Sequence, residues 1–231
     1  MICFGTKFQA MKKYLFIFLI LLVPALQSLA QQGETAEQAY TRVITERSDK
    51  IVDVMTFPSN ELKLRVRDLI IEHYRFLNDA EESRNADVAK IREEFAENKE
   101  LRNAKIDLRK AEQELKVRDH HFAFVSELKE IITEEQIDQV KDGLTYSVMP
   151  NTYVAFQDMI PDLTAEEKEQ IKIWLIEARE HAIDGGSSKE KHGWFGKYKG
   201  RINNYLSGRG YDLKKLGDEW HERLRKEGKE L

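Results

Sequence analysis

The chain has 231 residues, 34% of them charged and 10% aromatic, with a formal net charge of −4 and a single cysteine, Cys3. This length is sufficient for one domain with a proper hydrophobic core, and one cysteine excludes a scaffold held together by disulfides. The acidic balance also argues against a nucleic-acid-binding protein.

The N-terminus is typical of a secretory signal peptide. Met11 offers a second possible start, and two lysines precede an apolar run from Leu15 to Val23. Small residues then stand three and one positions before a cleavage site that follows Ala30. We expect residues 1–30 to be removed, which leaves a mature chain of residues 31–231 without any cysteine.

A transmembrane anchor is the alternative, but spanning a bilayer takes about 20 apolar residues and this run is shorter. No cysteine follows the run, so a lipid anchor is not expected. We therefore expect a periplasmic or secreted protein that does not contact the membrane once the signal peptide is cleaved.

Charge is unevenly distributed along the mature chain. Without the three lysines of the leader, 34 basic residues stand against 41 acidic ones. Residues 185–215 carry eight Lys and Arg against two acids, so a basic segment of +6 lies in an otherwise acidic protein. Such a segment favours an anionic partner, although lysines that solvate one helix face explain it equally well.

Helical periodicity runs through almost the whole mature chain. Phe57-Pro58-Ser59 separates a first helix from a second that begins near Glu61. The second helix has apolar residues along one side: Leu62, Val66, Leu69, Ile70 and Leu77. Between residues 80 and 119, 21 of 40 residues are charged.

Apolar residues recur within this charged region and just beyond it at a spacing of three and four: Leu101, Ala104, Leu108, Ala111, Leu115 and Phe122. The spacing predicts a long, exposed helix with one narrow buried seam, in a charged helical hairpin arm between about Glu61 and Arg118. The charged residues are then its solvated face. A coiled coil that binds a partner protein along this seam is the alternative.

Three capping boxes predict helix starts in the second half, because a hydroxyl covers free backbone amides and the third residue reaches back. They are Thr133–Gln136, Thr164–Glu167 and Ser187–Glu190. Between the first two, Gly143–Pro150 is short and apolar. We expect a buried crossing segment there, stopped by Pro150, rather than a helix.

The helix that follows Thr164 has an apolar stripe at helical spacing: Ile171, Trp174, Leu175, Ala178 and Ala182. Gly185-Gly186 should end this helix, and Asp212 should cap a last helix that ends around Lys226.

No alternating pattern indicates a strand. We therefore predict an all-α fold, a helical bundle with a long charged helical hairpin and a compact aromatic C-terminal helical half. It forms a single domain over residues 31–231, whose parts are residues 31–130 and residues 131–231.

Residues 184–211 are unusual because they combine glycine, aromatic side chains and positive charge. Each glycine inside a helix costs roughly 1 kcal/mol relative to alanine, so close packing or a ligand must compensate. If the segment is helical, one face carries Trp194, Tyr198, Arg201 and Tyr205, and a neighbouring face carries Phe195, Ile202 and Leu206. Gly193, Gly196 and Gly200 occupy a third side.

Two interpretations of this segment remain open. In the first, the glycines permit a tight helix–helix crossing and the aromatic residues are buried. In the second, a ligand groove is lined by Trp194, Tyr198, Arg201 and Tyr205, with His192 and Lys197 at its rim. Aromatic rings suit the apolar faces of sugars and Arg suits a carboxylate, so the ligand would be an acidic oligosaccharide or polysaccharide.

No catalytic, metal or cofactor motif accompanies these residues. The six histidines lack metal-ligand spacing, and we expect neither a metal nor a cofactor. A set of Ser187, His192 and Asp184 lacks the glycine-framed serine of a nucleophile elbow. Catalytic residues are therefore unknown, and a carbohydrate-active enzyme is a third alternative.

A resemblance to a known family is carried by three segments: Met149–Thr164, Ala178–Ala182 and Gly186–Leu206. The chain resembles a secreted family of Bacteroidetes that is catalogued as a domain of unknown function, number 3826. The similarity extends over the whole mature chain. The resemblance implies an all-helical protein exported by bacteria that degrade complex glycans. Such proteins are often encoded beside polysaccharide-utilisation genes, pectin-directed ones included. The resemblance implies no active site.

Ile132–Gln136 and Leu163–Glu167 are similar to the repeated Leu-Thr-x-x-Gln motif of small periplasmic helical chaperones. The first has Ile in place of Leu, and the second has Glu in place of Gln. We expect a non-catalytic glycan-binding or accessory protein of polysaccharide utilisation, with an ATP-independent holdase as the alternative. Such a holdase would shield unfolded or partner proteins with its charged hairpin.

Overall fold

The computed structural model describes residues 33–228, in which all regular structure is helical. The helices are α2 (Ala36–Asp53), α3 (Asn60–Glu94), α4 (Lys99–Lys129), α5 (Glu134–Leu144), α6 (Val148–Met159), α7 (Ala165–Ile183), α8 (Ser188–Gly208) and α9 (Leu213–Lys226). No strand occurs among the described residues, so the predicted all-α fold is confirmed. The predicted signal peptide over residues 1–30 lies outside them.

The chain falls into two compact units, residues 1–46 and residues 47–231. The second unit contains the last part of α2 and the whole of α3 to α9. The single domain expected over residues 31–231 stays a prediction. Over the described range, no helix combines the length and the apolar character that crossing a membrane requires.

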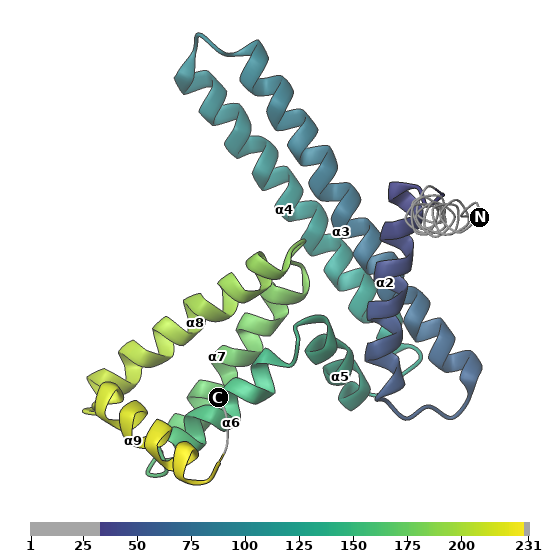
Figure 1. Cartoon of the computed structure of the whole chain (residues 1–231). Coiled ribbons are helices and arrows are strands. Elements are labelled where there is room, and N and C mark those ends of the chain that lie inside the picture. The colour runs from purple at the N-terminus through teal and green to yellow at the C-terminus, as the bar shows by residue number, and fades with distance from the viewer. Residues whose placement is uncertain (1–32, 229–231) are drawn as a thin grey trace, which may run out of the picture. The chain divides into compact units, whose positions relative to one another are not determined.

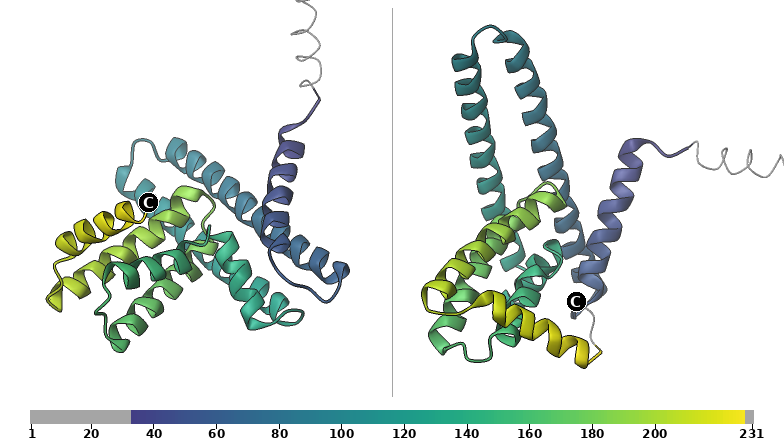
Figure 2. Two further views of the ribbon diagram at one scale, coloured as in Figure 1. Left: turned by 60° about the horizontal axis from the view of Figure 1, so that its bottom comes forward. Right: turned by 60° about the vertical axis from the view of Figure 1, so that its left-hand side comes forward.

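Helices α3 and α4 form the predicted hairpin arm, two long antiparallel helices joined by a short turn (Figure 1; Figure 2). The Ser59 hydroxyl caps α3 by accepting a hydrogen bond from Leu62 N at 3.2 Å. The Asn98 side chain caps α4 by accepting one from Leu101 N at 3.0 Å. Both helices therefore begin at a side chain that satisfies a free backbone amide.

The predicted buried seam of the arm is wrong. All six of its residues are exposed: Leu101, Ala104, Leu108, Ala111, Leu115 and Phe122. The face of α4 that contacts α3 instead buries Arg109 and Gln113, and Arg109 Nε donates to Asp87 Oδ2 at 2.8 Å. The facing side of α3 offers Ser83 and Asp87 to Arg109. Polar groups that pair across the hairpin thus form the contact, and the apolar stripe faces solvent.

A first hydrophobic core holds the base of the arm. Its buried members come from the end of α2, from α3, α4 and α5, from the end of α7 and from the connecting segments: Ile51, Val52, Met55, Val66, Ile70, Phe124, Leu128, Ile132, Ile137, Val140, Leu144 and Ile183. Helix α5 approaches α2 closely at Gly143, where an added Cβ would lie 2.7 Å from Ile51 Cγ1. Only glycine fits this approach without a shift of Ile51.

The segment Gly143–Pro150 differs from its prediction, because Val148 begins helix α6. Pro150 lies in the first turn of α6, where the backbone amide has no partner inside the helix, so proline is tolerated. Tyr146 and Ser147 turn the chain between α5 and α6, with φ angles of 58° and 54°.

Helices α7 and α8 pack against each other and contribute most of a second core (Figure 1). Four of the five predicted stripe residues of α7 are buried, as are the three predicted anchors of α8: Ile171, Leu175, Ala178, Ala182, Phe195, Ile202 and Leu206. Gly185-Gly186 follows the end of α7, and Asp212 caps α9. These predictions are confirmed.

The predicted capping boxes are present at Thr133 and Thr164. At the third, the Ser187 hydroxyl accepts from Glu190 N at 3.2 Å. The Glu190 carboxylate, however, accepts from Gly186 N at 2.9 Å, one residue earlier than the box requires. The glycine pair thus gains an ordered contact with the start of α8.

Candidate functional site

A cleft of about 650 Å³ lies between the arm and the α7–α8 pair, and we call it the Trp194 cleft. Helix α3 contributes Leu77, Glu81 and Arg84, and α4 contributes Gln113, Glu114, Val117, Arg118, His121 and Phe122. Helix α7, the glycine pair and α8 contribute Glu180, His181, Asp184, Gly185, Gly186, Glu190 and Trp194. Acidic side chains outnumber Arg side chains in this lining.

His121 of α4 joins the arm to α7 inside the cleft. Its Nδ1 donates to Asp184 Oδ2 at 3.0 Å, and its Nε2 lies 3.7 Å from Glu180 Oε2. The hydrogen bond to Asp184 raises the pKa of His121 above its ordinary value. Because both ring nitrogens face carboxylates, the imidazole is more readily protonated than a free one and links α4 to the end of α7.

The carboxylate of Glu180 also binds a cation from α5. Lys141 Nζ lies 2.6 Å from Glu180 Oε2, and Arg179 beside it pairs with Asp138 and Asp142. Arg179 and Lys141 are both largely buried. This network fixes the position of Glu180 before any ligand arrives.

Two oxygens at the cleft accept no hydrogen bond from a described residue. They are Asp184 Oδ1 and Gln113 Oε1, and both are buried. A buried acceptor without a donor costs about 1–3 kcal/mol. Both side chains belong to the cleft lining, but these two oxygens are themselves shielded from solvent, so a ligand reaches them only if the side chains move.

Trp194 supplies an aromatic surface in the wall of the cleft. Its indole stacks on the His181 ring of α7, with centroids 4.3 Å apart and planes 14° apart. Lys197 Nζ lies 4.9 Å from the indole centroid. Phe122, which is 62% exposed, adds an aromatic ring on the α4 side. Two aromatic groups from different helices thus accompany the polar lining.

The glycine pair lets the chain pass close to the arm. An added Cβ on Gly186 would lie 2.5 Å from Glu81 Oε2, and one on Gly185 would lie 3.0 Å from Lys191 Cγ. The Lys191 ammonium is buried and donates to Ile183 O at 3.2 Å. Burial lowers the pKa of Lys191 to about 8.

The structure separates the six residues predicted to form a groove. Trp194 lines the cleft, and none of the other five does. Tyr198 is 5% exposed within the second core, and burial raises its pKa to about 12. Lys197 is exposed beside Trp194, and His192 is exposed and stacks on Tyr146 of the α5–α6 turn.

Arg201 and Tyr205 lie farther along α8, over Trp174 of α7. The Arg201 guanidinium is 4.5 Å from the Trp174 ring centroid, and Tyr205 meets that ring edge-on at 5.2 Å. Arg201 Nη1 also lies 3.6 Å from Glu177 Oε2. Both residues therefore take part in the contact between α7 and α8.

The glycines of α8 do not serve a helix crossing. An added Cβ on Gly193, Gly196 or Gly200 would meet no atom within 4 Å. The interpretation in which these glycines permit a tight crossing is therefore wrong, because their side of α8 faces solvent.

Sequence reasoning did not select His121, Gln113 or Glu180. His121 and Asp184 are 63 residues apart, and only the packing of α4 against α7 brings them together. The set of Ser187, His192 and Asp184 is not assembled, since Asp184 binds His121 and His192 Nδ1 lies 2.7 Å from Ser188 O. The sequence feature that could have pointed to this site is the acidic Asp184 next to Gly185 and Gly186.

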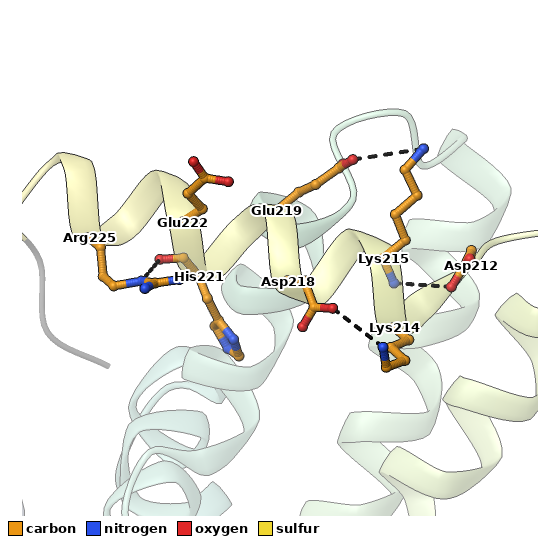
Figure 3. Close-up of a pocket in the computed structure, with 8 residues that line it drawn as sticks. All are labelled: Asp212, Lys214, Lys215, Asp218, Glu219, His221, Glu222 and Arg225. Carbon is orange, nitrogen blue, oxygen red and sulfur yellow. Dashed lines mark hydrogen bonds and ion pairs between the residues drawn. The ribbon is translucent and has the colours of Figure 1, made fainter.

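Other hollows in the second unit differ from the Trp194 cleft. Figure 3 shows one along α9, lined by Asp212, Lys214, Lys215, Asp218, Glu219, His221, Glu222 and Arg225. Its side chains all come from one helix and its cap, and Lys214 and Lys215 pair with carboxylates four residues ahead. It is a solvated helix face. No group of three or more possible metal ligands occurs within residues 33–228.

The sequence matches the family described as "Protein of unknown function (DUF3826)" over residues 41–226. The chain belongs to this family. No curated protein matches the chain.

The family match includes every residue that lines the Trp194 cleft, from Leu77 to Trp194. It also includes α3 to α9 in full. The cleft is therefore built from the region that defines the family and not from an added segment.

Proposed function

We propose that this protein binds oligosaccharides in the Trp194 cleft and performs no catalytic step on them. The observation that carries the proposal is the half-buried Trp194 indole in the wall of a cleft whose lining combines carboxylate, amide and guanidinium groups with apolar side chains. A sugar presents apolar C–H faces that suit an aromatic ring and hydroxyl groups that suit polar side chains.

The acceptor groups of the lining support the same class of ligand. Its carboxylates and the Gln113 amide accept hydrogen bonds, and the hydroxyl groups of a saccharide donate them. The acidic lining disfavours a polyanion in this cleft, so a neutral or amine-bearing oligosaccharide fits better than the acidic one expected from the sequence.

The resemblance to secreted proteins of glycan-degrading bacteria supports this ligand class as well. Under this proposal the protein acts outside the cytoplasm, after cleavage of its signal peptide, as an accessory of polysaccharide utilisation. The helical arm then forms one wall of the binding site.

A glycan array of neutral, amino and acidic oligosaccharides tests the proposal, followed by calorimetry on the best ligand. An aromatic contact contributes about 0.5–1.5 kcal/mol, so Trp194→Ala should weaken binding about two- to tenfold. Trp220→Phe on α9 is the matched control and should bind normally. Binding to no glycan, or equal binding by Trp194→Ala, would contradict the proposal.

The exposed stripe on α4 favours a second candidate function, an ATP-independent holdase. Four large apolar side chains recur every seven residues and are exposed to solvent: Leu101 by 41%, Leu108 by 61%, Leu115 by 50% and Phe122 by 62%. Each stands among charged residues. Apolar side chains that are spaced along a charged surface can contact the scattered apolar side chains of an unfolded polypeptide.

Suppression of aggregation of a chemically denatured protein tests the holdase. The double substitution Leu108→Ser, Leu115→Ser should abolish suppression while leaving the fold intact, because both side chains are exposed. Ile173→Ser, on an exposed position of α7, is the control and should retain suppression. If the wild type and both variants suppress aggregation equally, the exposed stripe on α4 does not bind the unfolded protein.

A further inference from the structure

A second cavity, of about 680 Å³, lies between the end of α2, α3, α5 and the α5–α6 turn, and we call it the Tyr146 cavity. Its lining residues are Arg47, Lys50, Ile51, Val54, Tyr74, Gln139, Asp142, Gly143, Tyr146 and Ser147. No residue is shared with the Trp194 cleft. The two cavities differ in charge, because the Tyr146 cavity has two cations and a single carboxylate.

The turn that places Tyr146 in the lining of this cavity has a strained backbone. Tyr146 and Ser147 both have positive φ, 58° and 54°, a conformation that costs a residue other than glycine on the order of 1–3 kcal/mol. The turn is held by Ser147 N, which donates to Asp142 O at 2.8 Å, and by Tyr146 N, which donates to Gly143 O at 3.3 Å. Neither position is a glycine, although glycine would remove the strain.

The phenol ring of Tyr146 is held but remains accessible. It stacks on the His192 ring of α8, with centroids 5.5 Å apart and planes 27° apart, while Tyr146 remains 46% exposed. A strained turn that keeps a large aromatic residue at the surface of a cavity provides a platform on which a ring can stack.

The two cations of the cavity are not neutralised by a paired carboxylate of the described residues. Arg47 and Lys50 lie three residues apart on α2, and neither forms an ion pair with a residue in the range 33–228. Asp142, the carboxylate of the lining, is already bound by Arg179 Nη1 at 2.8 Å. Two exposed cations beside an occupied carboxylate leave the cavity positive.

We propose that the Tyr146 cavity binds an organic anion that contains a ring. Its carboxylate or sulfate group lies between Arg47 and Lys50, which donate charge-assisted hydrogen bonds, and its ring stacks on Tyr146. A sugar acid and an aromatic acid share this chemistry. The site is independent of the oligosaccharide binding proposed for the Trp194 cleft.

Isothermal titration calorimetry of the mature chain at low ionic strength tests the site with four compounds: glucuronate, benzoate, glucose and inorganic sulfate. At least one ring anion should bind saturably, sulfate should bind more weakly and glucose should not bind. The glucuronate and benzoate titrations distinguish the sugar acid from the aromatic acid. Added salt should weaken binding, because the cations are exposed to solvent.

Three variants assign the contacts. Arg47→Ala with Lys50→Ala should weaken ring-anion binding at least tenfold. Tyr146→Asn keeps the left-handed turn, since Asn tolerates positive φ, and should weaken ring anions several-fold without changing sulfate binding. Lys214→Ala with Lys215→Ala on α9 removes the same charge elsewhere and should bind normally. Thermal unfolding of each variant verifies that it folds.

Several results would overturn the site. These are the absence of saturable binding by both ring anions, unchanged binding in the Arg47, Lys50 double variant, or an equal loss in the α9 control. If sulfate binds as tightly as the ring anions, Tyr146 does not contribute to binding, which also contradicts the proposal. None of these outcomes depends on whether the Trp194 cleft binds a glycan.

Discussion

Glycine residues in this chain have opposite effects on stability, because their surroundings differ. At Gly143 a side chain would overlap Ile51, with 2.7 Å between the added Cβ and Cγ1. At Gly200 an added Cβ would meet nothing within 4 Å, and the residue lies in the interior of α8. The first glycine is a packing requirement, whereas the second only weakens its helix.

Alanine substitution should therefore change stability in opposite directions at these two positions. Gly143→Ala forces α5 away from α2 and should lower the free energy of unfolding by about 1–3 kcal/mol, as overpacking does. Gly200→Ala should raise it by up to about 1 kcal/mol, because alanine is the better helix former. Urea unfolding of the two variants measures both. A loss at Gly200 as large as that at Gly143 would reveal a hidden contact of α8.

The buried His73 gives a prediction about acid stability. Burial lowers its pKa to about 3, and the residue is fully buried. Ile183 O can only accept, so His73 Nε2 carries the proton and donates at 3.1 Å. His73 Nδ1 then accepts from His120 Nε2 at 3.1 Å. Lys191 and His121 lie nearby and further disfavour a charged ring.

Because the folded pKa of His73 is depressed, its contribution to stability is present above pH 6.5 and is lost as the pH falls from 6.5 toward 3. The loss should reach about 2 kcal/mol at pH 5, since each pKa unit corresponds to about 1.4 kcal/mol. His73→Gln keeps a donor and an acceptor but does not titrate in this range. Urea unfolding between pH 7 and 5 should show a smaller loss in this variant. Parallel curves would contradict the prediction.

At the scale of elements, the sequence predicted helices better than their contacts. The start of α3, most of the α7 stripe and the capping boxes at Thr133 and Thr164 follow from local chemistry, and the structure confirms them. The prediction of a buried apolar seam in the arm was wrong, because apolar spacing cannot reveal which face of α4 contacts α3. The face that contacts α3 is the one on which Arg109 pairs with Asp87. The Trp194 cleft could not be predicted either, since residues on four helices and a loop form it.

The outer part of the arm should be less protected than helix α7. Between Lys99 and Arg118 the buried residues of α4 are Arg109 and Gln113, whereas α7 alone has seven buried residues. Regions with few buried contacts open at low free energy. In hydrogen exchange, amides of residues 80–118 should exchange at least tenfold faster than those of α7, after correction for intrinsic rates. An arm that exchanges most slowly would overturn this expectation.

At the scale of the second unit, polar contacts join the arm to the C-terminal helices. His73 of α3 binds Ile183 O, and His121 of α4 binds Asp184 just after α7. Ile183 itself belongs to the first core. The end of α7 is therefore the point at which both arm helices are attached, and the Trp194 cleft opens beside it. Binding in the cleft and attachment of the arm depend on some of the same side chains.

This attachment should weaken as the pH rises above neutrality. The hydrogen bond to Asp184 raises the pKa of His121, and Glu180 adds to this effect while burial and Lys141 oppose it. A raised folded pKa means that the stabilisation is fully present below pH 6.5 and is lost as the pH rises through the folded value. Wild-type protein should therefore lose stability as the pH rises above 6.5.

His121→Gln should remove this dependence, because glutamine can still donate to Asp184 but carries no charge. Urea unfolding of both proteins at pH 6, 7, 8 and 9 provides the measurement, and hydrogen exchange locates the change. Only the wild type should lose protection at the base of the arm as the pH rises. If both proteins lose the same free energy, the dependence arises elsewhere. Lys191 cannot supply such a loss, because its pKa is lowered to about 8 and its contribution to stability therefore grows as the pH rises toward 10.5.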